Sequence, residues 1–270
     1  MFGLNNSIDE STRHISSLNV LGLQVAVTTL QKATTSVIGL AYKKEGAYIC
    51  AANVHMCMEA YRDKEFQRIV NNATLTVPDG RPLTWWMRSF GVDNIEQVRG
   101  PDLFLSVCGR ACQAGIPIAF YGGETETLNN LKMYLLNNYN NIKIACAISP
   151  PFRELTENEE ASHIDQLRES GAQILFVGLG CPKQEKWMAK MKKDLAMVML
   201  GVGAAFDFYA GNKSIAPRWM STSGLEWLYR LLCEPKRLWK RYLYTNPHFM
   251  YLYARTLIKR RFSRIFLRRI

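Results

Sequence analysis

An aspartate between a proline and a glycine is the residue of this sequence best placed to act as a general base. The stretch TVPDGRPL, residues 76–83, puts Asp79 in a turn directly after a short apolar run. A carboxylate held at the end of a strand could take a proton from an acceptor hydroxyl. Pro-Asp-Gly is also a common turn tripeptide without a chemical role. From these residues alone, both interpretations stay open.

Four further segments leave an apolar run and offer small or polar residues. They are AANVH (51–55), FYGGE (120–124), VGLGCPKQE (177–185) and GVGAAFDFYAG (201–211). In open α/β sheets, ligands bind beyond the carboxyl ends of the strands, where helix N-termini favour phosphate. We therefore expect these loops and the Asp79 turn to form one concave site, with glycines that admit a diphosphate.

Three polar side chains in these loops could contact a ligand. The amide of Asn53 could fix a hydroxyl or amide group, or it could close an Asx turn. Gln184 follows Pro182 at a predicted helix start, where its amide could bond a sugar hydroxyl. Asp207 lies between aromatic residues, where an unpaired carboxylate is costly, so it needs a partner from the backbone, a ligand or an arginine.

Two further polar positions lie at predicted helix starts. In RGPD, Arg99 and Asp102 could form an ion pair, or Arg99 could face a phosphate. His55 fits a helix-start residue better than a base.

Several other site types are not expected. GVGAAF begins like GxGxxG but has Phe206 at the third glycine, and no acidic residue follows at the required distance. GLGCPKQE lacks the spacing of a P-loop. There is no DxD pair and no His/Asp/Glu cluster with metal-ligand spacing. The seven cysteines form no CxxC pair, so we expect buried, reduced thiols, no metal and no nicotinamide cofactor.

The elements that must position these residues alternate between strand and helix. Such alternation is typical of a mostly parallel sheet covered on both faces by helices, a Rossmann-like α/β fold. We expect strands at 18–25, 47–54, 74–77, 116–123, 141–148, 172–180 and 195–203. We expect helices at 28–44, 55–73 (one or two), from Pro82, and at 99–115, 124–139, 156–171 and 181–194, with Thr156 and Glu159 spaced as a capping box.

The last fifth of the chain differs in charge and pattern. From Pro217 onward there are 13 Lys/Arg and two acids, whereas the preceding residues carry 21 of each. We expect an α/β body at 1–214 and a helical, basic appendage at 215–270, broken near Pro235 and Pro247. Its mixture of aromatic and basic residues suits an anionic membrane interface. Nucleic-acid binding and packing in a homo-oligomer are the alternatives.

No membrane-spanning or secretory segment is expected. No window reaches the roughly 18 nearly uncharged apolar residues that a spanning helix needs. The first residues, MFGLNNSIDESTRH, lack the basic and apolar regions of a signal peptide.

The sequence resembles the WecG/TagA/CpsF bacterial glycosyltransferases (glycosyltransferase family 26). The resemblance is carried, in family order from about residue 18 to 243, by AANVHM, VPDGRPL, QVRGPDLF, FYGG, GAQILFVGLGCPKQEKWM, GVGAAFDFYAG and APRWMSTSGLEWLYRLLCEPKRLWKRYL. It implies transfer of a hexose or N-acetylhexosamine-type sugar from a UDP-sugar to a polyprenyl-diphosphate-linked saccharide. The implied place is the cytoplasmic face of the bacterial inner membrane, with peripheral attachment and no nucleic acid as partner.

The resemblance also implies roles for individual residues. It makes Asp79 the base of an inverting, metal-independent reaction, and it places Asn53, Arg99 and Gln184 in the substrate pocket. The nucleotide would be faced by Gly122, Gly123, Gly178, Gly180 and Asp207. The donor diphosphate would be covered by Arg230, Arg237 and Lys240.

Two departures from the family pattern bear on the substrates. Lys240 stands where relatives often have arginine, which keeps the charge but loses the bidentate geometry. Ala51 stands where relatives often have a hydroxyl residue, so one sugar contact is in doubt. A non-catalytic membrane or nucleic-acid binder and a nucleotide-sugar epimerase or dehydrogenase are the alternative functions.

Overall fold

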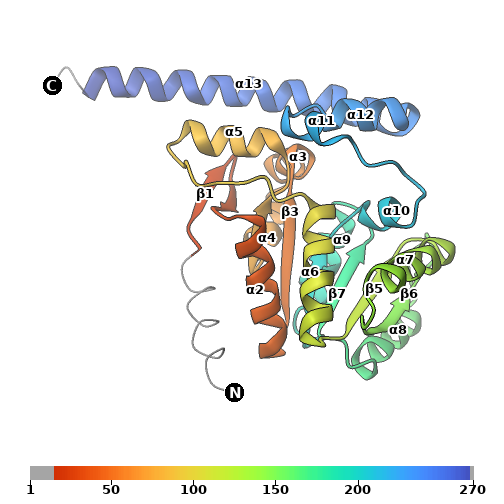
Figure 1. Ribbon diagram of the computed structural model, residues 1–270. Coiled ribbons are helices and arrows are strands. Elements are labelled where there is room, and N and C mark those ends of the chain that lie inside the picture. The colour runs from red at the N-terminus through yellow and green to blue at the C-terminus, as the bar shows by residue number, and fades with distance from the viewer. Residues whose placement is uncertain (1–14, 268–270) are drawn as a thin grey trace.

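A six-stranded, wholly parallel sheet forms the centre of the computed structural model, which describes residues 15–267, with side chains to residue 261 (Figure 1). The strands lie in the order β4-β3-β8-β7-β5-β6. Their bounds are β3 Ala47–Ala52, β4 Leu75–Pro78, β5 Ile118–Gly122, β6 Ile144–Ile148, β7 Ile174–Gly178 and β8 Val198–Gly201. The sheet and its helices confirm the Rossmann-like α/β fold expected from the sequence.

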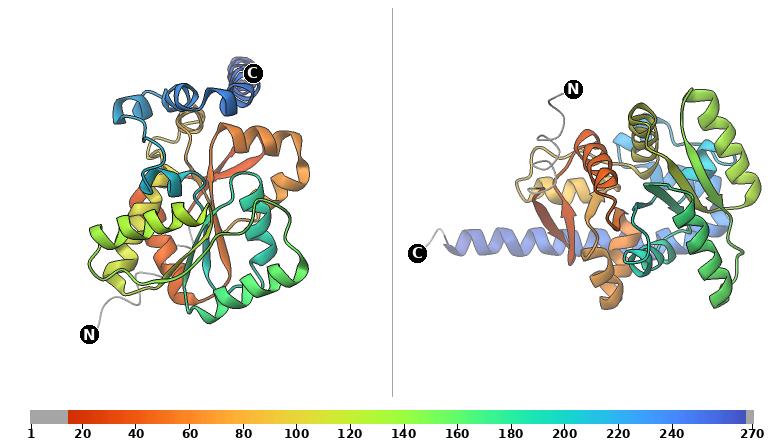
Figure 2. Two further views of the ribbon diagram at one scale, coloured as in Figure 1. Left: turned by 90° about the vertical axis from the view of Figure 1, so that its right-hand side faces the viewer. Right: turned by 90° about the horizontal axis from the view of Figure 1, so that it is seen from below.

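Helices cover both faces of this sheet (Figure 2). One hydrophobic core includes residues of α2 (Leu30–Lys43), α6 (Gly100–Ala114), α7 (Thr125–Asn138) and α10 (Ala205–Tyr209). The other includes residues of α3 (Val54–Arg62), α4 (Lys64–Asn71), α8 (Glu157–Glu169) and α9 (Lys183–Met191). Because side chains alternate between these cores, as Leu175 and Phe176 do in β7, the strands are continuously apolar.

The expected single strand at 18–25 is a hairpin instead. β1 (Ser17–Val20) pairs antiparallel with β2 (Leu23–Ala26), and Leu21 and Gly22 form the turn with φ values of 53° and 99°. A two-residue turn with both φ values positive matches the twist of paired strands. The prediction was wrong because leucine seldom adopts this conformation, so the apolar run gave no turn signal.

Helix starts were better predicted than the end of the chain. The Thr156–Glu159 capping box is present. The break expected near Pro247 is wrong, because α13 runs unbroken from Pro235 to Leu267. Proline removes one helical hydrogen bond, but Thr245 and Phe249 on either side of it are buried. Their packing against the body keeps the helix continuous.

A layer of helices lies over the carboxyl ends of the strands (Figure 1). It consists of α5 (Arg81–Ser89), α11 (Arg218–Thr222), α12 (Glu226–Cys233) and α13. Trp86 of α5 contacts the rings of Phe249 and Tyr253 of α13, with centroids 5.9 and 5.3 Å away. The helical, basic appendage predicted from the sequence is therefore present and packs on the body. The division at residues 214 and 215 into two units stays a prediction.

Among the described residues, no helix combines the length and the apolar character needed to cross a membrane.

Candidate functional site

A cavity of about 640 Å³ lies between the carboxyl ends of the strands and the helices α12 and α13. The loops after β3, β4, β7 and β8 supply one wall, and α12 and α13 supply the opposite wall. Eight sequence-predicted residues line this cavity: Asn53, Asp79, Gly178, Gly180, Gln184, Asp207 and two arginines of the appendage, Arg230 and Arg237. The strand-end loops therefore meet as expected, except for the loop after β5.

Asp79 is held from three sides at the end of β4. Its Oδ1 accepts a hydrogen bond of 2.8 Å from the backbone N–H of Gly100. Its Oδ2 accepts one of 3.2 Å from the amide of Asn53. Its own carbonyl accepts one of 2.8 Å from Gln97 Nε2. The carboxylate is thus oriented, and each oxygen keeps a lone pair for a ligand.

The surroundings of Asp79 favour its protonated form. Burial and the nearby negative charge of Glu226 raise the pKa of Asp79 to about 6, although hydrogen bonds from Gly100 and Asn53 and the charge of Arg99 oppose the shift. A carboxyl with such a pKa can take a proton and release it near neutral pH, as a general base must.

Asn53 combines the two roles that the sequence left open. It is the N-cap of α3, because its Oδ1 accepts from the backbone N–H of Met56 at 3.2 Å. The same amide donates to Asp79. His55 lies in the first turn of α3 and lines the cavity. Burial, followed by the charge of Arg241, lowers the pKa of His55 to about 4, so it is neutral at pH 7.

Gln184 is fixed at the start of α9 with little freedom. Its Oε1 accepts from Gly180 N at 3.2 Å, and its Nε2 donates to Glu185 Oε1 at 2.8 Å. A Cβ at Gly201 would lie 2.9 Å from this Nε2, so a side chain at that position would displace the Gln184 amide. One N–H of the Gln184 amide is left to donate to a ligand.

The four predicted glycines serve different purposes. Gly178 and Gly180 line the cavity, and nothing lies within 4 Å of a Cβ built at Gly180. Gly122 and Gly123 do not line it. A Cβ at Gly122 would lie 2.7 Å from the carbonyl group of Gly178. The absence of a side chain at Gly122 thus lets β5 and β7 approach each other.

Asp207 is partly exposed, with a side chain 31% accessible, and its partner is a lysine. Lys213 Nζ lies 2.8 Å from Asp207 Oδ2 and 3.4 Å from Glu234 Oε2. Glu234 in turn accepts two hydrogen bonds of 2.7 Å from Arg237. A chain of alternating charges therefore runs from α10 to α13 along one rim of the cavity.

Three arginines of the appendage face the cavity: Arg230, Arg237 and Arg241. The Nε of Arg230 is buried without a hydrogen-bond partner in the described part of the chain. Burial, followed by the charge of Arg237, lowers the pKa of Arg241, so this cation is partly desolvated and repelled by its neighbour. Lys240 does not line the cavity. Its Nζ lies 5.6 Å from the ring centroid of Trp239.

Arg99 also lies outside the lining of the cavity, although it neighbours Asp79. Its side chain is 9% exposed and forms ion pairs with Glu226 at 3.1 Å and Asp102 at 3.7 Å. Of the two alternatives for Arg99, the ion pair with Asp102 is present, and Glu226 of α12 is a second and closer partner.

Sequence reasoning did not single out several residues that the structure places at the site. They are Arg81, Gln97, Lys213, Glu226 and Arg241, which line the cavity or bond residues that line it. Arg241 adjoins the predicted Lys240, so helical geometry could have indicated it. Charge balance could have indicated Glu226, since it is one of only two acids after Pro217.

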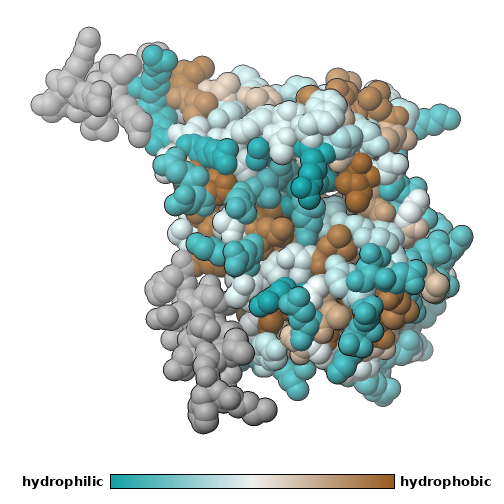
Figure 3. Space-filling view, in the orientation of Figure 1, coloured by the Kyte–Doolittle hydropathy of each residue, from teal (hydrophilic) through white to brown (hydrophobic). Residues whose placement is uncertain are grey.

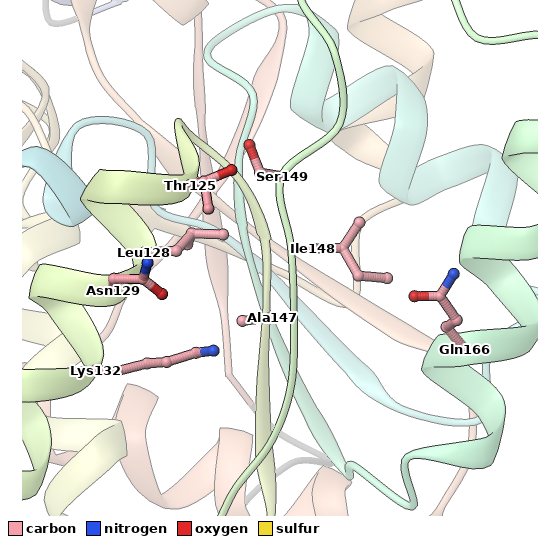
Figure 4. A pocket seen from close by; sticks show the side chains of 8 residues that line it. All are labelled: Thr125, Leu128, Asn129, Lys132, Ala147, Ile148, Ser149 and Gln166. Atoms are coloured by element: carbon pink, nitrogen blue, oxygen red, sulfur yellow. The ribbon is translucent and has the colours of Figure 1, made fainter.

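A second cavity, of about 270 Å³, lies beside the edge strand β6. Figure 4 shows side chains of α7 on one side of the strand and Gln166 of α8 on the other. None of the sequence-predicted site residues lines it. Within residues 15–261, no group of three His, Cys, Asp or Glu side chains is close enough to hold a metal ion.

Comparison with known families agrees with this geometry. Residues 18–263 match the model of the Glycosyl transferase WecG/TagA/CpsF family. The match spans nearly the whole chain, and the family acts in the synthesis of cell-surface polysaccharides. The chain belongs to this family and is a glycosyltransferase.

Proposed function

We propose that this member of the WecG/TagA/CpsF family transfers a hexose or N-acetylhexosamine-type sugar from a UDP-sugar to a polyprenyl-diphosphate-linked saccharide. One observation carries the proposal: the cavity places Asp79, whose pKa is raised to about 6, opposite the arginines of α12 and α13. A base and a cluster of cations are what transfer from a diphosphate donor requires.

Asp79 acts as the general base. The oxygen of the acceptor hydroxyl attacks C1 of the donor sugar from the side opposite UDP, and the configuration at C1 inverts. The bond from C1 to the diphosphate oxygen breaks, and its electron pair leaves with UDP. The hydroxyl proton passes to a free lone pair of Asp79. The hydrogen bonds from Gly100 and Asn53 aim the carboxylate, so that little reorganisation is needed during transfer.

Cationic side chains stabilise the charge that develops on the leaving diphosphate. The cavity is lined by five cations and three carboxylates, namely Arg81, Lys213, Arg230, Arg237 and Arg241 against Asp79, Asp207 and Glu226. This excess of positive charge suits a diphosphate. We therefore propose that no metal ion is needed.

The strand-end loops bind the donor. The unshielded backbone of Gly180 faces the cavity and admits the nucleotide diphosphate closely. The remaining N–H of the Gln184 amide donates to a sugar hydroxyl. Ala51 also lines the cavity and offers no hydrogen bond from its side chain. The sugar that lies against it is therefore recognised by shape there.

The outer face of α13 is proposed to rest on the membrane that contains the acceptor, on the cytoplasmic side of the inner membrane. Large hydrophobic side chains on this helix are exposed by 44–65%: Trp239, Leu243, Tyr244, Met250, Tyr251 and Ile258. Exposed Lys236, Lys240 and Arg255 lie among them. Figure 3 shows hydrophobic and hydrophilic groups interspersed along this layer. Such a surface suits anionic lipid headgroups. The side chains of residues 262–270, part of the predicted basic tail, lie outside the described residues.

A transfer assay tests the proposed reaction. The purified full-length chain is incubated with each of several UDP-sugars and a synthetic polyprenyl-diphosphate disaccharide. We expect one UDP-sugar to release UDP only when the acceptor is present, and the acceptor to gain the mass of one sugar. UDP release without a glycosylated product, or no release with any donor, would contradict the proposal. A nicotinamide absorbance in the purified protein would instead favour an epimerase or dehydrogenase.

A further inference from the structure

The docked position of α12 brings an acidic side chain next to the general base. Glu226 is the first residue of α12, and its side chain is 24% exposed at the cavity. Its Oε2 lies 3.1 Å from Nε of Arg99, whose side chain is 9% exposed, in an ion pair that lacks the geometry of a hydrogen bond. A nearly buried arginine needs a charged partner, and Glu226 is the closer of the two partners that the described residues supply.

Arg99 and Asp79 are neighbours through Gly100. Arg99 is the N-cap residue of α6, and the N–H of the next residue, Gly100, bonds the Asp79 carboxylate at 2.8 Å. The positive charge of Arg99 reaches Asp79, whose pKa it lowers, so without Glu226 the guanidinium would be drawn toward the carboxylate. A pair of these two groups would occupy the lone pairs that accept the proton and would favour the ionised form.

We propose that Glu226 is a positioning residue for the transfer reaction. By forming an ion pair with the guanidinium of Arg99, Glu226 keeps Arg99 from pairing with Asp79. The pKa of Asp79 therefore depends on whether α12 is docked on the body. The proposal rests on the proposed function, since it concerns the base of that reaction.

The charges around Asp79 support this arrangement. The pKa of Asp79 is raised first by burial and next by Glu226, and it is lowered by Arg99 after the two hydrogen bonds. The other charged or titratable groups at the cavity come from α3, α5, α10, α12, α13, the loop before α9 and the segment after α10: His55, Arg81, Asp207, Arg230, Arg237, Arg241, Tyr242, Cys181 and Lys213. Asp102 lies beyond Arg99.

As a consequence, Asp79 keeps its raised pKa only when α12 of the appendage is docked on the body. The segment that leads into α12 is attached to α5, because Arg81 Nε donates to the carbonyl of Thr222 at 2.9 Å. Undocking of α12 would remove a negative neighbour from Asp79 and a partner from Arg99. Both changes lower the pKa of Asp79, so the base weakens until α12 returns.

Two substitutions with opposite effects test the proposal. Glu226→Gln removes the negative charge and frees Arg99, so the pKa of Asp79 should fall by about one unit. Arg99→Gln removes the positive charge, so the same pKa should rise. The readout is the pH titration of the Asp79 carboxyl carbon by NMR, with Asp79→Asn to assign the signal. This readout needs no activity, and it therefore separates the inference from the proposed reaction.

Kinetics and a matched control complete the experiment. In Glu226→Gln, kcat should fall about tenfold at pH 8, with a smaller change in KM for the donor, and Glu226→Asp should restore part of it. Glu160→Gln, which removes a paired glutamate on the distant α8, should change neither the pKa of Asp79 nor kcat. If Glu226→Gln does not fold, the titration of Arg99→Gln decides alone. An Asp79 titration that both variants leave unchanged, or shift in the same direction, overturns the inference.

Discussion

Asn53 Nδ2 donates a hydrogen bond of 3.2 Å to Oδ2 of Asp79, although 26 residues separate them along the chain. The contact follows from the sheet, because β3 and β4 are parallel neighbours with Ala52 paired to Pro78. The residues that follow these two ends are therefore side by side. One short amide begins α3 and also aims the carboxylate, so both functions depend on the same side chain.

Substitutions of Asn53 should separate its two functions. Asn53→Asp keeps an oxygen acceptor for the N-cap of α3 but sets a second carboxylate beside Asp79, which raises the pKa of Asp79 and removes a donor. We expect transfer to fall by a factor of about 10² or more, with thermal unfolding little changed. Asn53→Ser also keeps the cap and should lose activity with a smaller shift of the pH profile. Equal activity of Asn53→Asp and the unmodified chain would contradict this role.

The pH dependence of kcat/KM should show the raised pKa of Asp79. A base works only when ionised, so the rate should rise with pH below the pKa of about 6 and level off above it. An unperturbed aspartate would place this limb near pH 4. The profile is measured from pH 4.5 to 8.5 at constant ionic strength. A rate that stays constant down to pH 5 would show that burial does not tune this carboxyl.

The glycines should divide into structural and ligand-facing positions. At Gly122 the φ of 114° and the 2.7 Å approach of Gly178 oppose any side chain, so Gly122→Ala should cost about 3 kcal/mol or more of unfolding free energy. Gly180→Ala meets no neighbour and should cost about 1–2 kcal/mol for its left-handed conformation, yet it should weaken UDP binding. Denaturant unfolding and calorimetric titration with UDP measure the two effects. Equal stability losses would refute the division.

Basic residues on α13 should control binding to anionic vesicles. The triple change of Lys236, Lys240 and Arg255 to Gln removes about 1 kcal/mol of attraction per charge, so partitioning should weaken by a factor of about 10². Vesicles of neutral phospholipid should bind weakly in both cases. The control changes Lys44, Lys143 and Lys193, which precede strands at the opposite end of the sheet. If this control weakens binding as strongly, α13 is not the membrane face.

The architecture follows from the sequence because the central strands β3, β5, β7 and β8 are buried on both faces and several helices have their own start signals. Thr156 with Glu159 is one such signal. The hairpin turn at Leu21 and the unbroken helix at Pro247 escaped prediction for a shared reason. In both places tertiary contacts stabilise a conformation that the local residues disfavour, and no local pattern reports those contacts.

The sequence predicts the site residues that follow strand ends, but not those contributed by segments distant in the sequence. Asn53, Asp79 and Gln184 each follow a strand, so one rule about parallel sheets gathers them. Lys213 and Glu226 come from segments whose docking no periodicity describes. The family resemblance named Arg230 and Arg237, but the contact of Lys213 with Glu234, the partner of Arg237, is visible only in three dimensions.

The most direct test of the account is single-turnover transfer by the Asp79→Asn variant. With saturating donor and lipid-diphosphate acceptor at pH 8, we expect the rate to fall by about 10²–10⁴ while the affinity for UDP stays as in the unmodified chain. The control Asp165→Asn, on the exposed face of α8, should transfer normally. A folded Asp79→Asn variant that transfers sugar at the unmodified rate would show that Asp79 is not the base.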